Sequence, residues 1–280
     1  MSVAHDLPAR KGGAKALLLT VLGEFVLPSG GGAWTSSLLS AADALGLGEK
    51  NARQALSRIK GQGLIDSARH GRLVRWALTP SGRQLLEAGT ERIYSFGRRD
   101  VEWNGQWLTA HCPVAESRRA VRNELRSELR YLGFGELSAS LLISPRVDRD
   151  PELRQVLERL GLLNESTIVW AQSLNETDEH RLVARAWDLD QLAASYVDFT
   201  ETHSNTETSE PHAAFAALVA LVHDWRRFPF MDPELPTKLL PDDWPGASAV
   251  DMFHKMHTAL SIAAQGWFAS TELSVKRGLT

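Results

Sequence analysis

The chain has 280 residues, of which 43% are hydrophobic and 23% are charged, a composition typical of a globular protein with two or three cores. No apolar run approaches the roughly 18 residues that a membrane-spanning helix needs, and residues 1–13 lack the apolar segment of a signal peptide, so we expect a cytoplasmic protein without membrane contact. Cys112, the single cysteine, excludes an intrachain disulfide and a thiolate metal cluster, and is interpreted as a small buried apolar residue.

The formal net charge of −3 is unevenly distributed along the chain. Residues 1–99 carry 14 Lys and Arg against 7 Asp and Glu, whereas the remaining residues carry 17 against 27. A basic N-terminal part on an acidic remainder indicates a nucleic-acid partner for the basic part.

Three helices are predicted within this basic part. Apolar residues at helical spacing predict the first, a Gly-rich run ends it, and hydroxyl residues offer caps for the second. A short turn containing Gly46 and Gly48 separates the second helix from the third. The expected helices span about residues 17–25, 35–45 and 49–62.

The third helix has two different faces. At 100° per residue, Ala52, Ala55, Leu56 and Ile59 share one arc, which can pack on the first two helices. The opposite face is cationic and rich in amide side chains. A polar helix face usually only meets water, but solvated faces mix charge signs, and acids are almost absent after Glu49. The preceding Gly-containing turn agrees with a helix-turn-helix.

A hairpin is predicted directly after this helix. Strands near residues 64–65 and 74–78 flank a turn at His70-Gly71, and Thr79-Pro80 begins a fourth helix that extends to about Phe96. Three arginines flank the turn or face away from the alternating apolar side chains of the second strand. A surface hairpin with solubilising arginines is the alternative, but its position after the third helix favours a DNA-contacting wing.

The sequence therefore predicts a winged helix-turn-helix. Its third helix would enter the major groove of double-stranded DNA, with two copies of a homodimer on a palindromic operator. The expected base-reading residues are Lys50, Asn51, Gln54 and Ser57. The expected phosphate-binding residues are Thr35, Ser36, Ser37, Arg53, Arg58, Arg69, Arg72 and Arg75.

The middle of the chain alternates strands and helices. Strands near 107–112, 137, 141–143 and 167–171 and helices near 117–132 and 151–160 give the order βαββαβ of a ferredoxin-like domain. Arginines recur every four residues on the first of these helices. A solvated, partly ion-paired face is the plainest interpretation, with a dimer contact or a further phosphate contact as alternatives. The four arginines are Arg118, Arg122, Arg126 and Arg130.

The C-terminal part is predicted to be helical, with helices near 187–199, 213–225 and 252–267 and a Pro-rich segment before the last. No glycine-rich phosphate loop, metal-ligand spacing or nucleophile elbow is found, so no catalytic residue, metal or cofactor is predicted. His254 and His257 are interpreted as core or surface residues. The expected α+β chain has a winged-helix domain at 1–99, a ferredoxin-like domain at 100–176 and a helical domain at 177–280.

These segments resemble the PaaX family of bacterial transcriptional repressors. The resemblance implies a DNA-reading head, a ferredoxin-like middle domain and a helical tail in a repressor of aromatic-catabolism genes. It also implies release from DNA on binding an aryl-coenzyme A thioester, typically phenylacetyl-CoA. Leu64-Ile65 departs from the family, which more often has Trp before the strand. The matching segments are 19–25, 34–35, 50–58, 71–72, 78–80, Gly82, 223–230, 232–233, 235–236, 239–241, 243–246 and Phe253.

The middle region also resembles the small ferredoxin-like nuclease subunit of CRISPR adaptation. Those nucleases hold a metal with an aspartate at the end of the first strand. The corresponding end here is His111-Cys112-Pro113, which has no carboxylate, so the resemblance does not imply a nuclease.

An acyl-CoA effector needs an apolar slot for its acyl group and cations for its phosphates. The string 225–228 offers both kinds of side chain, although its aromatic residues could equally form a core. An enzyme acting on CoA thioesters or nucleic acid, and a module that binds proteins instead of DNA, are the competing functions. The candidate effector-binding residues are Trp225, Arg226, Arg227, Lys238 and Trp244.

Overall fold

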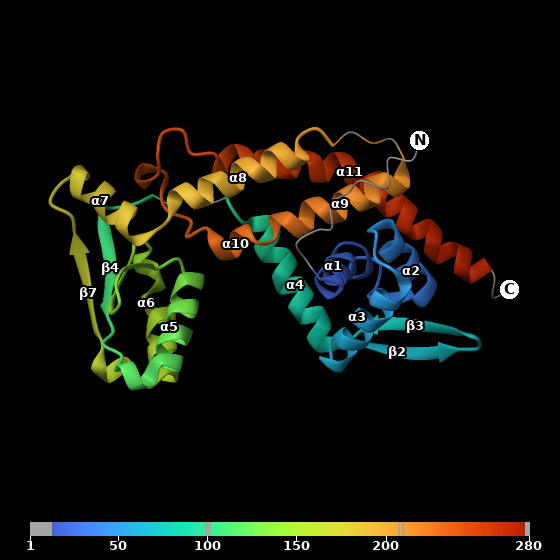
Figure 1. The fold of residues 1–280 in the computed structure, drawn as a ribbon, viewed down its shortest axis with the longest axis horizontal. Coiled ribbons are helices and arrows are strands. Elements are labelled where there is room, and N and C mark those ends of the chain that lie inside the picture. Colours follow the sequence, from blue (N-terminus) through green and yellow to red (C-terminus); the bar gives the residue numbers. More distant parts are fainter. Residues whose placement is uncertain (1–12, 99–101, 207, 209, 278–280) are drawn as a thin grey trace. The chain divides into compact units, whose positions relative to one another are not determined.

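The computed structural model describes residues 13–98, 102–206, 208 and 210–277 (Figure 1). Helices and two antiparallel sheets confirm the α+β class. The chain folds into two compact units. Unit 1 comprises residues 1–95, 199–226 and 251–280, and unit 2 comprises 96–198 and 227–250. Residues 177–280, predicted as one domain, are thus divided between the units, and the predicted boundary at 99/100 lies outside the described residues.

Unit 1 begins with three helices and a three-stranded sheet. The first helix ends earlier than predicted, because a π-helical turn, η2, follows it and contains Phe25. The sheet has the order β1-β3-β2 and is antiparallel throughout. The elements are α1 (Ala14–Val21), η2 (Leu22–Val26), β1 (Gly32–Trp34), α2 (Thr35–Ala44), α3 (Glu49–Gly61), β2 (Ile65–His70), β3 (Leu73–Leu78) and α4 (Pro80–Ser95).

C-terminal helices complete unit 1. Helix α9 (Pro211–Trp225) contacts both α1 and α2. Helix α11 (Gly246–Arg277) contributes Phe268, whose ring centroid lies 5.4 Å from that of Phe25, while Phe215 of α9 lies 4.7 Å from Phe25. Aromatic contacts between segments far apart in sequence therefore build the core of this unit.

Unit 2 contains a four-stranded antiparallel sheet of order β5-β6-β4-β7. Side chains alternate along the central strand β4, and this alternation divides the core in two. Leu108 faces a cluster that includes Leu125 and Leu153 from two helices, whereas Trp107 packs with Val183 and Leu235. The elements are β4 (Gln106–His111), η3 (Glu116–Arg118), α5 (Arg119–Tyr131), β5 (Gly135–Ser138), β6 (Leu141–Ser144), η4 (Val147–Arg149), α6 (Asp150–Arg159), η5 (Leu163–Glu165) and β7 (Thr167–Gln172).

The remaining elements follow the sheet. Helix α7 (Glu176–Ala186) was not predicted, and Trp187, predicted to begin a helix, lies between α7 and α8 (Leu189–His203). A short helix α10 (Phe228–Met231) and η6 (Thr237–Leu239) occupy the Pro-rich segment. Cys112 is 1% exposed, as predicted, and burial raises the pKa of its thiol. None of the described helices combines the length and apolar character needed to cross a membrane.

Candidate nucleic-acid interface

Helix α3 has one buried face and one exposed, cationic face. Its apolar residues Ala52, Ala55, Leu56 and Ile59 are at most 1% exposed, and the helix contacts α1 and α2. All the residues predicted to face DNA from this helix are exposed. They are Lys50, Asn51, Arg53, Gln54, Ser57 and Arg58.

The β2–β3 hairpin ends in a tight turn, with one exposed arginine in the turn and another near it on β2. Residues Gly71 and Arg72 connect the strands, and Gly71 has φ 62°, the left-handed conformation that glycine adopts without strain. A positive φ at the first central residue is typical of a hairpin turn. Arg69 and Arg72 are both exposed near this tip, where their side chains have room to reach a ligand.

Three of the predicted phosphate-binding residues are buried or make contacts within the fold. Ser37 is 1% exposed and cannot reach a phosphate. The Thr35 hydroxyl donates to the Val74 carbonyl at 3.0 Å and accepts from the Trp76 indole at 2.9 Å. The Arg75 guanidinium donates to the Gly32 carbonyl at 3.3 Å and lies 5.5 Å from the centre of the Trp34 ring. Ser37 is therefore removed from the predicted interface, and Thr35 and Arg75 hold β1 on β3.

Ion pairs occupy part of the cationic surface in the free chain. Arg53 pairs with Glu49 at 2.8 Å, and Lys60 pairs with Asp66 at 2.8 Å. The hydrogen bond from Lys60 lowers the pKa of Asp66. Exposed pairs of this kind contribute about 0–1 kcal/mol, so Arg53 can exchange Glu49 for a phosphate at little cost.

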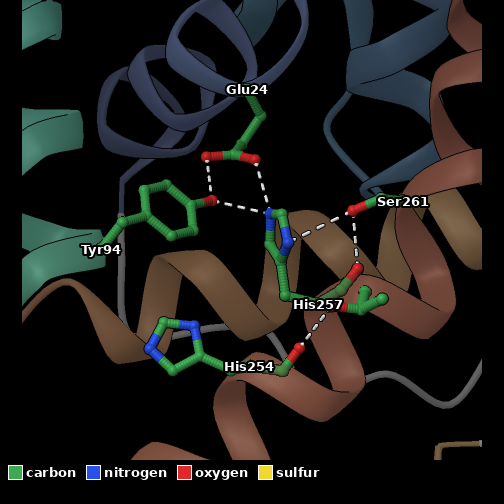
Figure 2. Close-up of polar contacts among 6 residues, drawn as sticks. Glu24, Tyr94, His254, His257 and Ser261 are labelled. Carbon is green, nitrogen blue, oxygen red and sulfur yellow. Dashed lines mark hydrogen bonds and ion pairs between the residues drawn. The ribbon is translucent and has the colours of Figure 1, made fainter. Parts of the chain in front are cut away.

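A second polar cluster in unit 1 joins η2, α4 and α11 (Figure 2). The Tyr94 hydroxyl donates to Glu24 Oε1 at 2.6 Å and lies 2.7 Å from His257 Nε2, which is 3.1 Å from Glu24 Oε2. On the other side of the imidazole, Ser261 Oγ lies 3.2 Å from Nδ1. Burial, followed by the charge of Glu24, raises the pKa of Tyr94, so the phenol stays protonated and donates.

The order Ser261, His257, Glu24 is that of a hydrolase nucleophile, base and acid. The Ser261 hydroxyl is, however, also placed to donate to the His257 carbonyl at 2.6 Å, one helical turn earlier. One proton cannot serve both acceptors, so the helix competes for the proton that a base would remove. We interpret the cluster as a structural contact that holds η2, α4 and α11 together. No group of three His, Cys, Asp or Glu in the described part of the chain is placed to hold a metal.

The predicted effector-binding residues are divided between the two units, with Trp225 and Arg226 in unit 1 and the others in unit 2. Trp225 is 0% exposed and stacks on Phe253 with centroids 4.7 Å apart, so it belongs to the core of unit 1, the alternative left open by the sequence. Lys238 and Trp244 line two different cavities of unit 2. Burial lowers the pKa of Arg226, and Arg227 lies 3.9 Å from Asp198.

Three family models match consecutive parts of the chain. The PaaX-like protein model matches residues 13–82, the PaaX central Cas2-like domain matches 100–183, and the PaaX-like C-terminal domain matches 187–270. The chain belongs to the PaaX family.

Individual relatives extend this likeness over nearly the whole chain. The Escherichia coli (strain K12) transcriptional repressor PaaX is 26% identical over 273 residues, which cover 94% of this chain and 85% of the relative. The solved structure of the uncharacterized protein Rv0674 from Mycobacterium tuberculosis is similar with a TM-score of 0.62 at 21% identity. That match covers 92% of this chain and 98% of the other, and it supports the fold alone.

Proposed function

We propose that this protein is a homodimeric transcriptional repressor that binds a palindromic DNA operator through a winged helix-turn-helix. In this interpretation α2 and α3 form the helix-turn-helix and the β2–β3 hairpin forms the wing. The observation that carries the proposal is the exposed face of α3, where cationic and amide side chains lie together opposite a fully buried apolar face. The E. coli relative of this chain is named a transcriptional repressor, which supports the same function.

The side chains on this surface suit two kinds of contact. Amide and lysine side chains on α3 can pair with base edges in the major groove, since Asn and Gln suit adenine and Lys suits guanine. Exposed arginines suit phosphates. We assign Lys50, Asn51, Gln54 and Ser57 to bases, and Ser36, Arg53, Arg58, Arg69 and Arg72 to phosphates.

The family resemblance suggests the regulatory part of the proposal. The controlled genes would encode aromatic catabolism, and an aryl-CoA thioester such as phenylacetyl-CoA would release the repressor. Release requires that the ligand bind more tightly to a form of the dimer that does not fit the operator. Thermal-shift titration with a panel of aryl-CoA thioesters tests this part, and the absence of a shift with every thioester would remove the effector from the proposal.

Substitutions on α3 and at the hairpin tip should affect DNA binding differently. We expect Gln54→Ala to change the preference among operator sequences, because it removes a base contact. Arg72→Ala should weaken specific and random duplex alike, because it removes a phosphate contact. Fluorescence anisotropy measures both effects, with a labelled duplex from the DNA upstream of the protein's own gene and with a random duplex of equal length.

Arg119→Ala is the matched control, because Arg119 is an exposed arginine on α5, outside the proposed interface. It should leave both affinities unchanged. Equal losses on both duplexes for Gln54→Ala and Arg72→Ala would contradict the assigned roles. If the wild-type protein had no affinity for any double strand at low ionic strength, the repressor proposal itself would fail.

A further inference from the structure

The open edge of the three-stranded sheet in unit 1 is held by a residue from the last helix of the chain. Strand β1 lies at this edge, and its last residue is Trp34. The Trp34 backbone N–H donates to Glu272 Oε1 at 2.9 Å. Glu272 belongs to the C-terminal part of α11, 238 positions further along the chain, and both residues lie in unit 1. The sheet that carries the proposed wing is therefore tied to α11.

Trp34 also contacts the hairpin. Its side chain is buried, and its ring centroid lies 5.6 Å from that of His70, at an interplanar angle of 82°. The Arg75 guanidinium lies 5.5 Å from the centre of the same Trp34 ring. His70 is the last residue of β2 and directly precedes the turn residues Gly71 and Arg72. A displacement of Trp34 would thus change the contacts that support the hairpin tip.

The same hydrogen bond lies at the start of the helix-turn-helix. Trp34 is the N-cap of α2, and its own side chain makes no capping hydrogen bond. A carboxylate is favourable near this point, because the helix dipole is positive at the N-terminus. Ser36, which we assign to a phosphate, lies exposed in the first turn of α2. One contact therefore supports both the hairpin and the first turn of α2, which follow and precede α3 in the chain.

Glu272 has no ion pair and no further hydrogen bond among the described residues. The buried indole N–H of Trp34 has no hydrogen-bond partner there either, so it does not anchor the ring. A carboxylate close to a DNA-binding surface repels phosphates by its charge. A negative charge at this place weakens DNA binding unless the hydrogen bond to Trp34 contributes more through the geometry of the interface.

We propose that Glu272 is a positioning residue of the DNA interface, which holds the β2–β3 hairpin and the first turn of α2 in the arrangement that contacts the duplex. The inference rests on the proposed repressor function, because DNA affinity is its main readout. It makes the C-terminal part of α11 an element of the DNA-binding unit. The sequence alone places this segment in a separate helical domain, because no local pattern relates Glu272 to Trp34.

Fluorescence anisotropy of full-length variants, with the upstream duplex and the random duplex, tests the proposal. We expect Glu272→Ala to weaken binding to both by about tenfold, because the loss of a hydrogen bond to a charged group loosens the hairpin and α2 together. Loss of the negative charge alone would strengthen binding instead. Glu272→Gln should stay within about twofold of the wild type, because its amide oxygen still accepts the Trp34 N–H. Asp251→Ala, which removes an exposed carboxylate from the same helix, should also stay within about twofold.

Two further measurements separate positioning from general stability. Tyr94→Phe removes hydrogen bonds to Glu24 and His257 instead of a contact to β1. It should lower the free energy of unfolding but leave the DNA affinity of the folded protein within about twofold of the wild type. Hydrogen–deuterium exchange of the free protein should become faster at residues 32–36 and 69–73 in Glu272→Ala, and not in Glu272→Gln or Tyr94→Phe.

An unchanged or higher DNA affinity of Glu272→Ala would overturn the proposal, as would an equal loss in Glu272→Gln. An equal loss in Tyr94→Phe would overturn it too, because the effect would follow stability alone. If the wild type bound no duplex, the repressor function would fail, and the exchange rates would still show whether Glu272 holds β1 and the hairpin. Unchanged exchange at residues 32–36 in Glu272→Ala would contradict that contact itself.

Discussion

Gly82 lies where the first turn of α4 meets the residue before β2. A Cβ on Gly82 would lie 1.8 Å from the Leu64 carbonyl oxygen, so only glycine allows this approach. The Thr79 hydroxyl accepts from the Gly82 N–H at 3.0 Å and donates to the Gly63 carbonyl at 2.6 Å. One capped helix start therefore fixes the base of the hairpin that carries Arg69 and Arg72.

Gly82→Ala should destabilise the protein by about 1–3 kcal/mol or more, because the methyl group forces the backbone apart. Gly89→Ala is a matched control in the same helix, where a Cβ meets nothing within 4 Å. The control should be neutral or stabilising by up to about 1 kcal/mol, as expected for glycine in a helix interior. Urea unfolding measures both, and equal stabilities of the two variants would contradict the close approach.

Asp232 gives unit 2 a pH-dependent stability. Burial raises the pKa of its carboxyl above the ordinary 3.8, although it accepts hydrogen bonds from the Tyr196 hydroxyl and the Glu234 N–H, both at 2.6 Å. The folded protein thus binds this proton more tightly than the unfolded chain. The resulting stabilisation is complete below the unfolded pKa and is lost as the pH rises through the folded pKa.

Asp232→Asn should remove this component, because the amide stays neutral at every pH. Its melting temperature relative to the wild type should therefore rise from about pH 4 to about pH 7.5. Differential scanning calorimetry across this range is the measurement. Parallel curves for the two proteins would show that the carboxyl is ionised alike in the folded and unfolded states.

At the scale of elements, periodicity predicted the helices and strands whose burial is regular. It placed α3 to within a residue or two and separated its buried alanines from its exposed cations. It missed β1, because a Gly-Ala-Trp segment becomes a strand only by pairing with β3. It missed α7, whose Asn175 cap and acidic first turn were available as signals.

Side-chain direction within elements was harder to predict. Alternation placed Arg75 on the outer face of its strand, but Gly32 leaves room for the guanidinium on β1. A Cβ at Gly32 would lie 2.9 Å from Arg75 Nε. Similarly, no local pattern shows that Glu24, Tyr94 and His257 meet, because they come from three separate elements.

The hydrogen bonds among Tyr94, Glu24 and His257 should contribute measurably to the free energy of unfolding. Tyr94→Phe removes the hydroxyl that binds both Glu24 and His257, and leaves a Glu24 oxygen with less compensation in a site where its side chain is 12% exposed. We expect a loss of about 1–3 kcal/mol in urea unfolding. In Tyr94→Phe/Glu24→Ala the two losses should not add, because each single substitution already removes the Tyr94–Glu24 hydrogen bond. Strict additivity would mean that the contact contributes nothing.

At the scale of the whole molecule, the basic and the acidic parts of the chain contribute different structures. The basic segment 1–99 supplies the exposed surface of α3 and the hairpin, while the acidic remainder supplies the second unit and the helices that complete the first. A net charge of −3 would by itself argue against a nucleic-acid partner. The charge of the local surface that faces a DNA duplex matters more than the net charge, because charges beyond about 10 Å are screened at 0.1 M salt.

The salt dependence of DNA affinity tests both the proposed arginine–phosphate contacts and the number of subunits that bind the DNA. If Arg53, Arg58, Arg69 and Arg72 each bind a phosphate in both copies of a dimer, the slope of log K against log salt should be about −7. Arg72→Ala should reduce its magnitude by about 1.8 in a dimer but only about 0.9 in a monomer. Arg119→Ala, exposed on α5, should leave the slope unchanged. Anisotropy titrations between about 50 and 200 mM salt supply these slopes. A flat slope would exclude the arginine contacts, whereas a change near 0.9 would exclude the dimer and keep them.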